Sequence, residues 1–153
     1  MAKRLGLKDK SIEIGIEKIK SINARFETSL NKNGAIIINN GYNSNLDSAV
    51  YSLKAMQLFN KSHKVIITPG LIECTDNYDY NFQFGKLIAK YCSDIIIVKK
   101  TNRDAILSGI KDAKFDLAKV YVVDDFKQVQ KVISEADETY SVLIENDLPD
   151  NYK

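Results

Sequence analysis

The fold of this chain is decided by two apolar runs, each followed by a polar loop: residues 35–45, AIIINNGYNSN, and residues 64–70, KVIITPG. Four small or β-branched apolar residues in succession, Ala35 to Ile38, are typical of a strand buried on both faces. The segment Leu46–Phe59 is long enough for a helix that returns the chain, so that the second strand lies parallel to the first. Residues 35–71 are therefore predicted to form a βαβ unit.

Both polar loops are predicted to lie at the ligand-binding edge of the sheet. Ligands bind outside the carboxyl ends of parallel strands, and the segments Asn39–Asn45 and Thr68–Thr75 follow such ends. The first loop carries four side-chain amides and a tyrosine hydroxyl, which exchange hydrogen bonds with a ribose, a base edge or a peptide without adding charge. The alternative is structural: Asn and Gly favour turns, Asn45 or Asp47 caps the next helix, and Thr68–Gly70 only ends a strand.

The rest of the chain alternates between strand and helix patterns. An antiparallel edge hairpin is predicted from the strand Arg25–Leu30 and the turn signal Asn33-Gly34. The remaining predicted elements are helices over Tyr78–Tyr91, Asn102–Ala113 (Ala105, Ile106, Ile110 and Ala113 inward) and Asp125–Ala136, and strands over Ile95–Val98, Lys119–Val123 and Tyr140–Ile144, the last closing the sheet. The pattern predicts an α/β fold: an open, mostly parallel Rossmann-like sheet of about six strands with flanking helices.

Composition and charge are typical of one globular domain. The chain has 153 residues, of which 44% are hydrophobic and 27% charged, and its net charge of +2 is spread along the sequence. No dense basic stripe argues for nucleic acid or an anionic membrane as a partner. No signal peptide or membrane-spanning run is recognisable, so a cytoplasmic location is expected.

Several kinds of catalytic site are not indicated by the sequence. Cys74 and Cys92 lack the spacing of metal ligands, and His63 lies in a polar connector away from both, which argues against a zinc site and a histidine-activated nucleophile. Both thiols are expected to be free. The sequence also lacks a G-x-x-x-x-G-K-[ST] phosphate loop, so the chain carries no motif of its own for ATP hydrolysis.

Four segments together resemble the C-terminal domain of the Mur ligase family: Ala24–Glu27, Ile37–Ser48, Thr68–Glu73 and Glu145–Tyr152. The similarity spans nearly the whole chain, and the Tyr-Asn-x-Asn loop at residues 42–45 is its most specific element. Within the family, the sequence is most similar to the branch of UDP-N-acetylmuramoyl-tripeptide:D-alanyl-D-alanine ligases.

The resemblance implies a role within a larger enzyme. In this family the first domain binds a UDP-sugar, the central ATPase domain carries the phosphate loop, and the C-terminal domain closes over the site. With ATP and magnesium the ligase activates a carboxylate of the UDP-MurNAc-peptide as an acyl phosphate, which the amine of D-Ala-D-Ala attacks. The chain alone is expected to be inactive and to bind no cofactor tightly, and the expected location is the bacterial cytoplasm.

The same resemblance assigns roles to individual residues. Arg25 matches an interdomain arginine that approaches the nucleotide phosphates; we expect it to be exposed, the alternative being a surface ion pair with Glu27. The other residues assigned by resemblance are Asn39, Tyr42 and Asn43 for nucleotide binding, and Asn45, Gly70 and Glu73 for the substrate cleft.

The sequence departs from the family pattern in three places. Asn39 and Asn40 replace an acidic pair, and Leu46 replaces a proline. The ending at residues 145–150 resembles that of a subset of the branch, in place of the more familiar close that contains lysine and serine. A folylpolyglutamate synthase-like ligase is an alternative, although it normally has a histidine where this chain has Tyr42. A standalone, non-catalytic nucleotide- or peptide-binding module is another.

The N-terminal segment is predicted to be separate from the main domain. A turn at Leu5–Asp9 precedes a helix with Ser11 as its N-cap and with Ile12, Ile16 and Ile19 at helical spacing. By the resemblance, residues 1–22 are the tail of the central domain with its linker helix, and residues 23–153 form the C-terminal domain. The sequence leaves open whether the chain is an excised domain or naturally short, which stem-peptide residue the substrate carries, and the oligomeric state.

Overall fold

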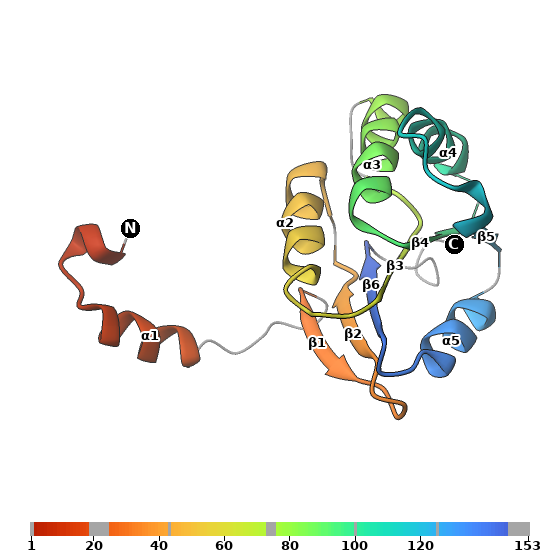
Figure 1. The fold of residues 1–153 in the computed structure, drawn as a ribbon. Coiled ribbons are helices and arrows are strands. Elements are labelled where there is room, and N and C mark those ends of the chain that lie inside the picture. Colours follow the sequence, from red (N-terminus) through yellow and green to blue (C-terminus); the bar gives the residue numbers. More distant parts are fainter. Residues whose placement is uncertain are drawn as a thin grey trace.

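A single sheet of six strands organises the computed structural model, which describes residues 2–18, 25–42, 44–72, 76–99, 101–124 and 126–146. The strand order is β1-β2-β6-β3-β4-β5 (Figure 1). β1 (Glu27–Leu30) runs antiparallel to β2 (Ile36–Asn40), and all other neighbouring pairs are parallel. The predicted open, mostly parallel α/β sheet with an antiparallel edge hairpin is confirmed.

The other elements follow the predicted alternation. They are α1 (Asp9–Glu17), α2 (Leu46–Met56), β3 (His63–Thr68), α3 (Asn77–Tyr91), β4 (Asp94–Val98), α4 (Arg103–Asp112), β5 (Val120–Val123), α5 (Phe126–Glu135) and β6 (Tyr140–Glu145), with short 3-10 helices at Ala2–Leu5 and Leu117–Lys119. Predictions for Ala24, Cys74, Asp125 and the ending at residues 147–152 lie outside the described residues. Cys92 is free and buried, and burial raises the pKa of its thiol.

The last strand lies in the centre of the sheet, so the prediction that it closes the sheet is wrong. β6 pairs with β2 on one side and with β3 on the other, which places Val142 between Ile37 and Val65. β2 and β3 are parallel, as predicted, but they are not neighbours. Because β6 ends between them, its last residue, Glu145, lies between the two predicted ligand loops.

Two apolar cores lie on opposite faces of the sheet. Side chains alternate along each strand, so that Ile38 packs on one face and Ile37 on the other. Helices α2, α3 and α4 cover the first face, and α5 covers the second (Figure 1). The strands are therefore buried on both sides, as their continuous apolar runs predict.

Helices α3 and α4 approach each other closely through two glycines. A Cβ on Gly85 would lie 2.3 Å from the Ile106 carbonyl oxygen, and one on Gly109 would lie 2.0 Å from the Phe82 carbonyl oxygen. Ala113, predicted to face inward, is exposed, because α4 ends at Asp112 and its inner face is formed by residues up to Ile110. The close packing of α3 on α4 therefore depends on the absence of side chains at these glycines.

Helix α1 differs in part from its prediction. It begins at Asp9 after Lys8, so Ser11 lies in the first turn and is not the N-cap. The turn before it is present, with Gly6 at φ +81°. No residue of α1 is buried, and the helix lies apart from the sheet (Figure 1). Residues 19–22 are outside the described part of the chain, so the domain boundary at residue 22 stays a prediction.

No helix in the described part of the chain is long and apolar enough to cross a bilayer.

Candidate functional site

The candidate site lies where β2, β6 and β3 end side by side. Because these strands are parallel, Asn40, Glu145 and Thr68 all reach the same edge of the sheet. Asn39 and Asn40 belong to β2, where they pair with Ile144 and Glu145, so the prediction that they lie in the loop is wrong. The ladder extends over them because β6 continues the sheet beside them.

Glu145 is buried at the centre of this edge, with an exposed fraction of 0%. Its carboxylate accepts hydrogen bonds from Asn40 Nδ2 (3.0 and 3.1 Å to the two oxygens), from Ser52 Oγ (2.7 Å) and from Ser44 Oγ. Asn40 and Glu145 belong to two of the places where the sequence departs from the family pattern. They contact each other directly.

The protonation equilibrium of Glu145 is shifted by this environment. Burial raises the pKa of the Glu145 carboxyl, and the hydrogen bonds from Ser44, Ser52 and Asn40 oppose the rise without cancelling it. The folded chain therefore binds this proton more tightly than the unfolded chain does. The group makes folding depend on pH.

We expect the free energy of unfolding to fall as the pH rises from about 4.5, the ordinary pKa of the Glu145 carboxyl, to its raised value. Over this window the folded state binds more protons than the unfolded state, and each pKa unit corresponds to about 1.4 kcal/mol. Glu145→Gln should flatten this dependence in urea unfolding curves measured from pH 4.5 to 8. The matched variant at an exposed position, Glu138→Gln, should retain the slope. Equal slopes in the wild-type chain and Glu145→Gln would contradict the assignment.

Asn146 follows Glu145 and connects the two ligand-side loops. It adopts a left-handed backbone with φ +69° and is 2% exposed. Its backbone N donates to the Asn40 carbonyl (3.1 Å), its Oδ1 accepts from Ser44 N (3.4 Å), and its Nδ2 donates to the Gly70 carbonyl (2.7 Å). The predicted cleft residue Gly70 is therefore held by the strand that lies between the loops.

Gly70 occupies a position that only glycine fits. Its φ is +89°, and a Cβ would lie 2.5 Å from Asn81 Oδ1 and 2.8 Å from Asn102 Cβ. Asn81 pairs with both the N–H and the carbonyl of Leu71, and Asn102 Nδ2 donates to the Pro69 carbonyl. Buried side-chain amides thus fix the backbone of the second loop.

Arg25 and Tyr42 meet on the exposed side of the site. The Arg25 guanidinium carbon lies 4.0 Å from the centre of the Tyr42 ring. Both residues are exposed, as expected for Arg25, and none of the carboxylates in the described segments pairs with its guanidinium. Phe26, at φ +52°, donates its N–H to Asn40 Oδ1 (3.1 Å) and so fixes the chain next to Arg25. The structure brings together two residues that are distant in sequence and were both assigned to the nucleotide.

The other predicted site residues have mixed outcomes. Asn39 is half-buried, and its Oδ1 accepts from Gly41 N (3.1 Å). Asn45 is the N-cap of α2, in a reciprocal capping box with Ser48. Its side-chain oxygen therefore caps the helix, which is the structural alternative given above to a role in ligand binding. Asn43 and Glu73 lie outside the described residues.

A hollow of about 380 Å³ lies beside the site, between the first turns of α2 and α3. Its lining residues are Asn45, Leu46, Asp47, Asp79, Tyr80 and Gln83. Within the described ranges, no group of three or more His, Cys, Asp or Glu side chains is arranged to hold a metal ion.

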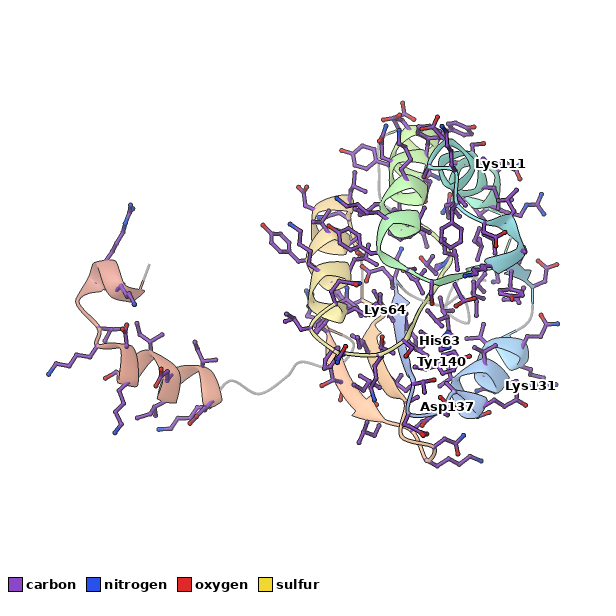
Figure 2. The ribbon with its side chains drawn as sticks, viewed as in Figure 1. His63, Lys64, Lys111, Lys131, Asp137 and Tyr140 are labelled. Carbon is purple, nitrogen blue, oxygen red and sulfur yellow. The ribbon has the colours of Figure 1, made fainter. Side chains whose placement is uncertain are left out.

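The opposite edge of the sheet carries the histidine. His63 is the first residue of β3, so the prediction that it lies in the polar connector is wrong. Its ring stacks on Tyr140 with centroids 4.5 Å apart, and the two side chains lie next to each other in Figure 2. Tyr140 begins β6, so both rings lie at the amino ends of their strands. His63 is therefore separated from the candidate site by the length of the strands.

Sequence reasoning placed Asn40 in the ligand loop without a role of its own, and it assigned no role in the site to Glu145, Asn146, Asn81 and Asn102. One signal was present in the sequence: a charged residue and an asparagine directly after the apolar run Val142–Ile144. This pattern marks the end of a buried strand, where polar side chains reach the ligand-binding edge. The burial of Glu145 could not be inferred without the central position of β6.

Comparison with solved structures identifies the fold, although no family model and no curated protein matches the chain. The MurF ligase from Thermotoga maritima, solved in complex with ADP, superposes with a TM-score of 0.72 at 14% identity over 95% of this chain and 32% of that chain. A MurF structure from Acinetobacter baumannii gives a TM-score of 0.66 at 17% identity over 95% and 31% of the two chains. The fold is that of a Mur ligase domain.

The Mur ligase fold also occurs as a separately solved domain. A domain from a putative UDP-N-acetylmuramate:L-alanyl-γ-D-glutamyl-meso-diaminopimelate ligase of Haemophilus ducreyi gives a TM-score of 0.54 at 11% identity, over 81% of this chain and 89% of that one. By contrast, the chain spans about a third of the length of the MurF ligases.

Proposed function

We propose that this chain is the closing domain of an ATP-dependent ligase that adds D-Ala-D-Ala to a UDP-MurNAc-peptide. The observation that carries the proposal is the stacking of Arg25 on Tyr42, 4.0 Å apart, at the exposed ligand edge of a Mur ligase fold. The choice of this branch is supported by the higher similarity to the MurF ligases, with a TM-score of 0.72 against 0.54 for the Haemophilus ducreyi domain.

The donors at the site fit a nucleotide. The exposed Arg25 guanidinium offers a planar fork suited to phosphate oxygens, and Tyr42 offers a ring face and a hydroxyl. Asn39 adds a neutral amide near the same edge. When bound to the enzyme, ATP with magnesium supplies the phosphoryl group that activates the substrate carboxylate as an acyl phosphate. The resemblance assigns the phosphate loop to the central domain.

The residues of this chain would position the reactants and exclude water. Arg25 would bind the nucleotide phosphates only when the domain closes, so that closure completes the site. Asn45 and Gly70 would line the cleft for the amine substrate. Removing water from the closed cleft would protect the activated carboxylate from hydrolysis before the amine attacks.

The proposed partners are the preceding ATPase and UDP-sugar-binding domains. The chain spans about a third of the MurF ligases, which leaves room for both domains in an enzyme of that size. Helix α1 presents exposed apolar side chains, with Ile14 44% and Ile16 61% exposed, which suit packing against a neighbouring domain. We place this enzyme in the bacterial cytoplasm.

Substrate dependence of ADP release tests the proposed function. In a protein that joins the chain to its two proposed partner domains, ADP release should require both UDP-MurNAc-tripeptide and D-Ala-D-Ala. meso-Diaminopimelate should not replace the dipeptide. Activity with L-glutamate and a folate acceptor would instead indicate a folylpolyglutamate synthase-like enzyme, and ligand binding without turnover would indicate a binding module.

Tyr42→Ala should separate function from stability. Tyr42 is 53% exposed, so we expect its loss to change the free energy of unfolding by less than about 1 kcal/mol. The same change should lower ligase activity in the joined protein, because Arg25 loses the ring that holds it. Tyr51→Ala, at a residue that is 73% exposed on α2, should affect neither property. A sharp fall in melting temperature for Tyr42→Ala would show that the loop is structural.

A further inference from the structure

The two ligand-side loops are linked through Glu145, the last residue of the central strand β6, and Asn146, which follows it. The Glu145 carboxylate accepts hydrogen bonds from Asn40, at the end of β2 where the first loop begins, and from Ser44 in that loop. Asn146 binds the same loop at Ser44 N and the second loop at the Gly70 carbonyl. Among the described strands, β6 alone lies between β2 and β3.

The contacts extend from Glu145 to Arg25. Asn40 donates to the Glu145 carboxylate through Nδ2 and accepts from Phe26 N through Oδ1 (3.1 Å). Phe26 directly follows Arg25, which stacks on Tyr42. The orientation of the Asn40 amide, which Glu145 fixes because a carboxylate only accepts, therefore determines where the chain enters β1.

Burial of the Glu145 carboxyl does not by itself favour the stability of the fold. A buried charged group contributes little compared with apolar side chains of similar size, and its desolvation is unfavourable. Glu145 nevertheless lies fully buried, and Asn146 lies 2% exposed in a left-handed backbone conformation, which asparagine adopts more readily than most residues do. What the pair provides is a set of directed hydrogen bonds to both loops.

We propose that Glu145 and Asn146 form a clamp that holds the two ligand-side loops and the Arg25 segment in one arrangement, as positioning residues of the site. Glu145 is the shared acceptor of the first loop, and the Asn146 amide sets the spacing between the first loop and Gly70. The effect on catalysis rests on the proposed function, whereas the effect on loop geometry does not.

Amide hydrogen exchange of the 153-residue chain, followed by NMR, tests the clamp. Asn146→Gly retains a residue that adopts positive φ and removes only the side chain. Exchange at Ser44, Gly70 and Leu71 should accelerate about tenfold or more. Exchange at Ile66, inside β3, should change less than about twofold. Uniform acceleration at all sites, or no change at Gly70, would overturn the proposal.

A second variant distinguishes the two hydrogen bonds of the Asn146 side chain, one made by Oδ1 and one by Nδ2. Asn146→Asp keeps the acceptor for Ser44 N but replaces the donor to the Gly70 carbonyl with an oxygen. Exchange should therefore accelerate at Gly70 and Leu71 and stay near the wild-type rate at Ser44. The matched control is Asn33→Gly in the exposed turn between β1 and β2, which should leave both loops unchanged. Equal acceleration of both loops in Asn146→Asp would contradict the clamp.

The kinetic test distinguishes failure of the clamp from failure of the proposed function. In the protein joined to its partner domains, Asn146→Asp should raise the KM for nucleotide or dipeptide more than it lowers kcat, because the chemical groups remain and their placement changes. A fall in kcat with an unchanged KM would contradict a positioning role. If the wild-type joined protein has no ligase activity, the proposed function fails, and the exchange measurements still decide whether the clamp exists.

Discussion

Replacing Gly109 with alanine is expected to lower the free energy of unfolding by roughly 3 kcal/mol. The new Cβ would lie 2.0 Å from the Phe82 carbonyl oxygen and 3.0 Å from Lys86 N, and backbone atoms cannot move aside as a flexible side chain can. Helices α3 and α4 must therefore separate, which opens the core around Ile106. For a chain of this size the melting temperature should fall by about 6–12 °C.

Gly15 provides a matched control for this substitution. It is also a helical glycine, in α1, but apart from its chain neighbours and the backbone of its own helix no atom lies within 4 Å of the Cβ that alanine would add there. Gly15→Ala should leave the melting temperature unchanged or raise it slightly, since alanine favours a helix over glycine by about 1 kcal/mol. A melting temperature of Gly109→Ala equal to that of Gly15→Ala would show that the α3–α4 contact is looser than the structure indicates.

Arg25→Lys is expected to lower ligase activity on the order of 100-fold in the protein joined to its partner domains. Lysine retains the charge, but its ammonium is a point charge that does not reproduce the two parallel hydrogen bonds of a guanidinium to phosphate oxygens. It also lacks the planar group that stacks on Tyr42 at 4.0 Å. Because Arg25 is exposed, thermal stability should change little.

The control for Arg25→Lys is the same substitution at Arg103. Arg103 is the half-buried first residue of α4, and its Nε pairs with the exposed carboxylate of the adjacent Asp104 (3.0 Å). Arg103→Lys should leave activity and stability within measurement error of the wild type. Wild-type kcat and KM in Arg25→Lys would remove Arg25 from the proposed nucleotide site.

The strands and helices of the fold were predictable because each follows from a local pattern of apolar residues in the sequence. The run Ala35–Ile38 and the similar run Ile95–Val98 predict strands buried on both faces, and the structure contains both. The order of the strands was not predictable, because apolar runs carry no information about which strands pair. β6 was therefore predicted to close the sheet, whereas it lies between β2 and β3, and this position creates the site.

The candidate site was predictable in location but only partly in detail. The loop after β2 and the position of Gly70 follow from the rule for parallel strands, and both lie at the expected edge. The contact of Arg25 with Tyr42 depends on the unusual positive φ of Phe26, which the sequence does not encode recognisably. Asn45 illustrates a real ambiguity, since an asparagine before a helix suits a cap as well as a ligand, and here it caps α2.

The burial of Glu145 was also not predictable, because it depends on strand order and on contacts distant in sequence. A glutamate after an apolar run resembles an exposed residue at a strand end, and only the neighbouring strands β2 and β3 and the overlying helix α2 cover it. Its partners Asn40 and Ser52 lie more than 90 residues away in sequence, with separations of 105 and 93. Such long-range hydrogen bonds cannot be inferred from local pattern or spacing.

ATP turnover with and without this chain tests the central claim most directly. The proposed ATPase and UDP-sugar-binding domains would be assayed for ADP release in the presence of ATP, magnesium, UDP-MurNAc-tripeptide and D-Ala-D-Ala, either alone or joined to residues 1–153. We predict dipeptide-dependent ADP release only in the joined protein, and none from the 153-residue chain by itself, because its sequence lacks a phosphate loop. Equal dipeptide-dependent release without the chain, or ATP turnover by the chain alone, would contradict its assignment as the closing domain of a ligase.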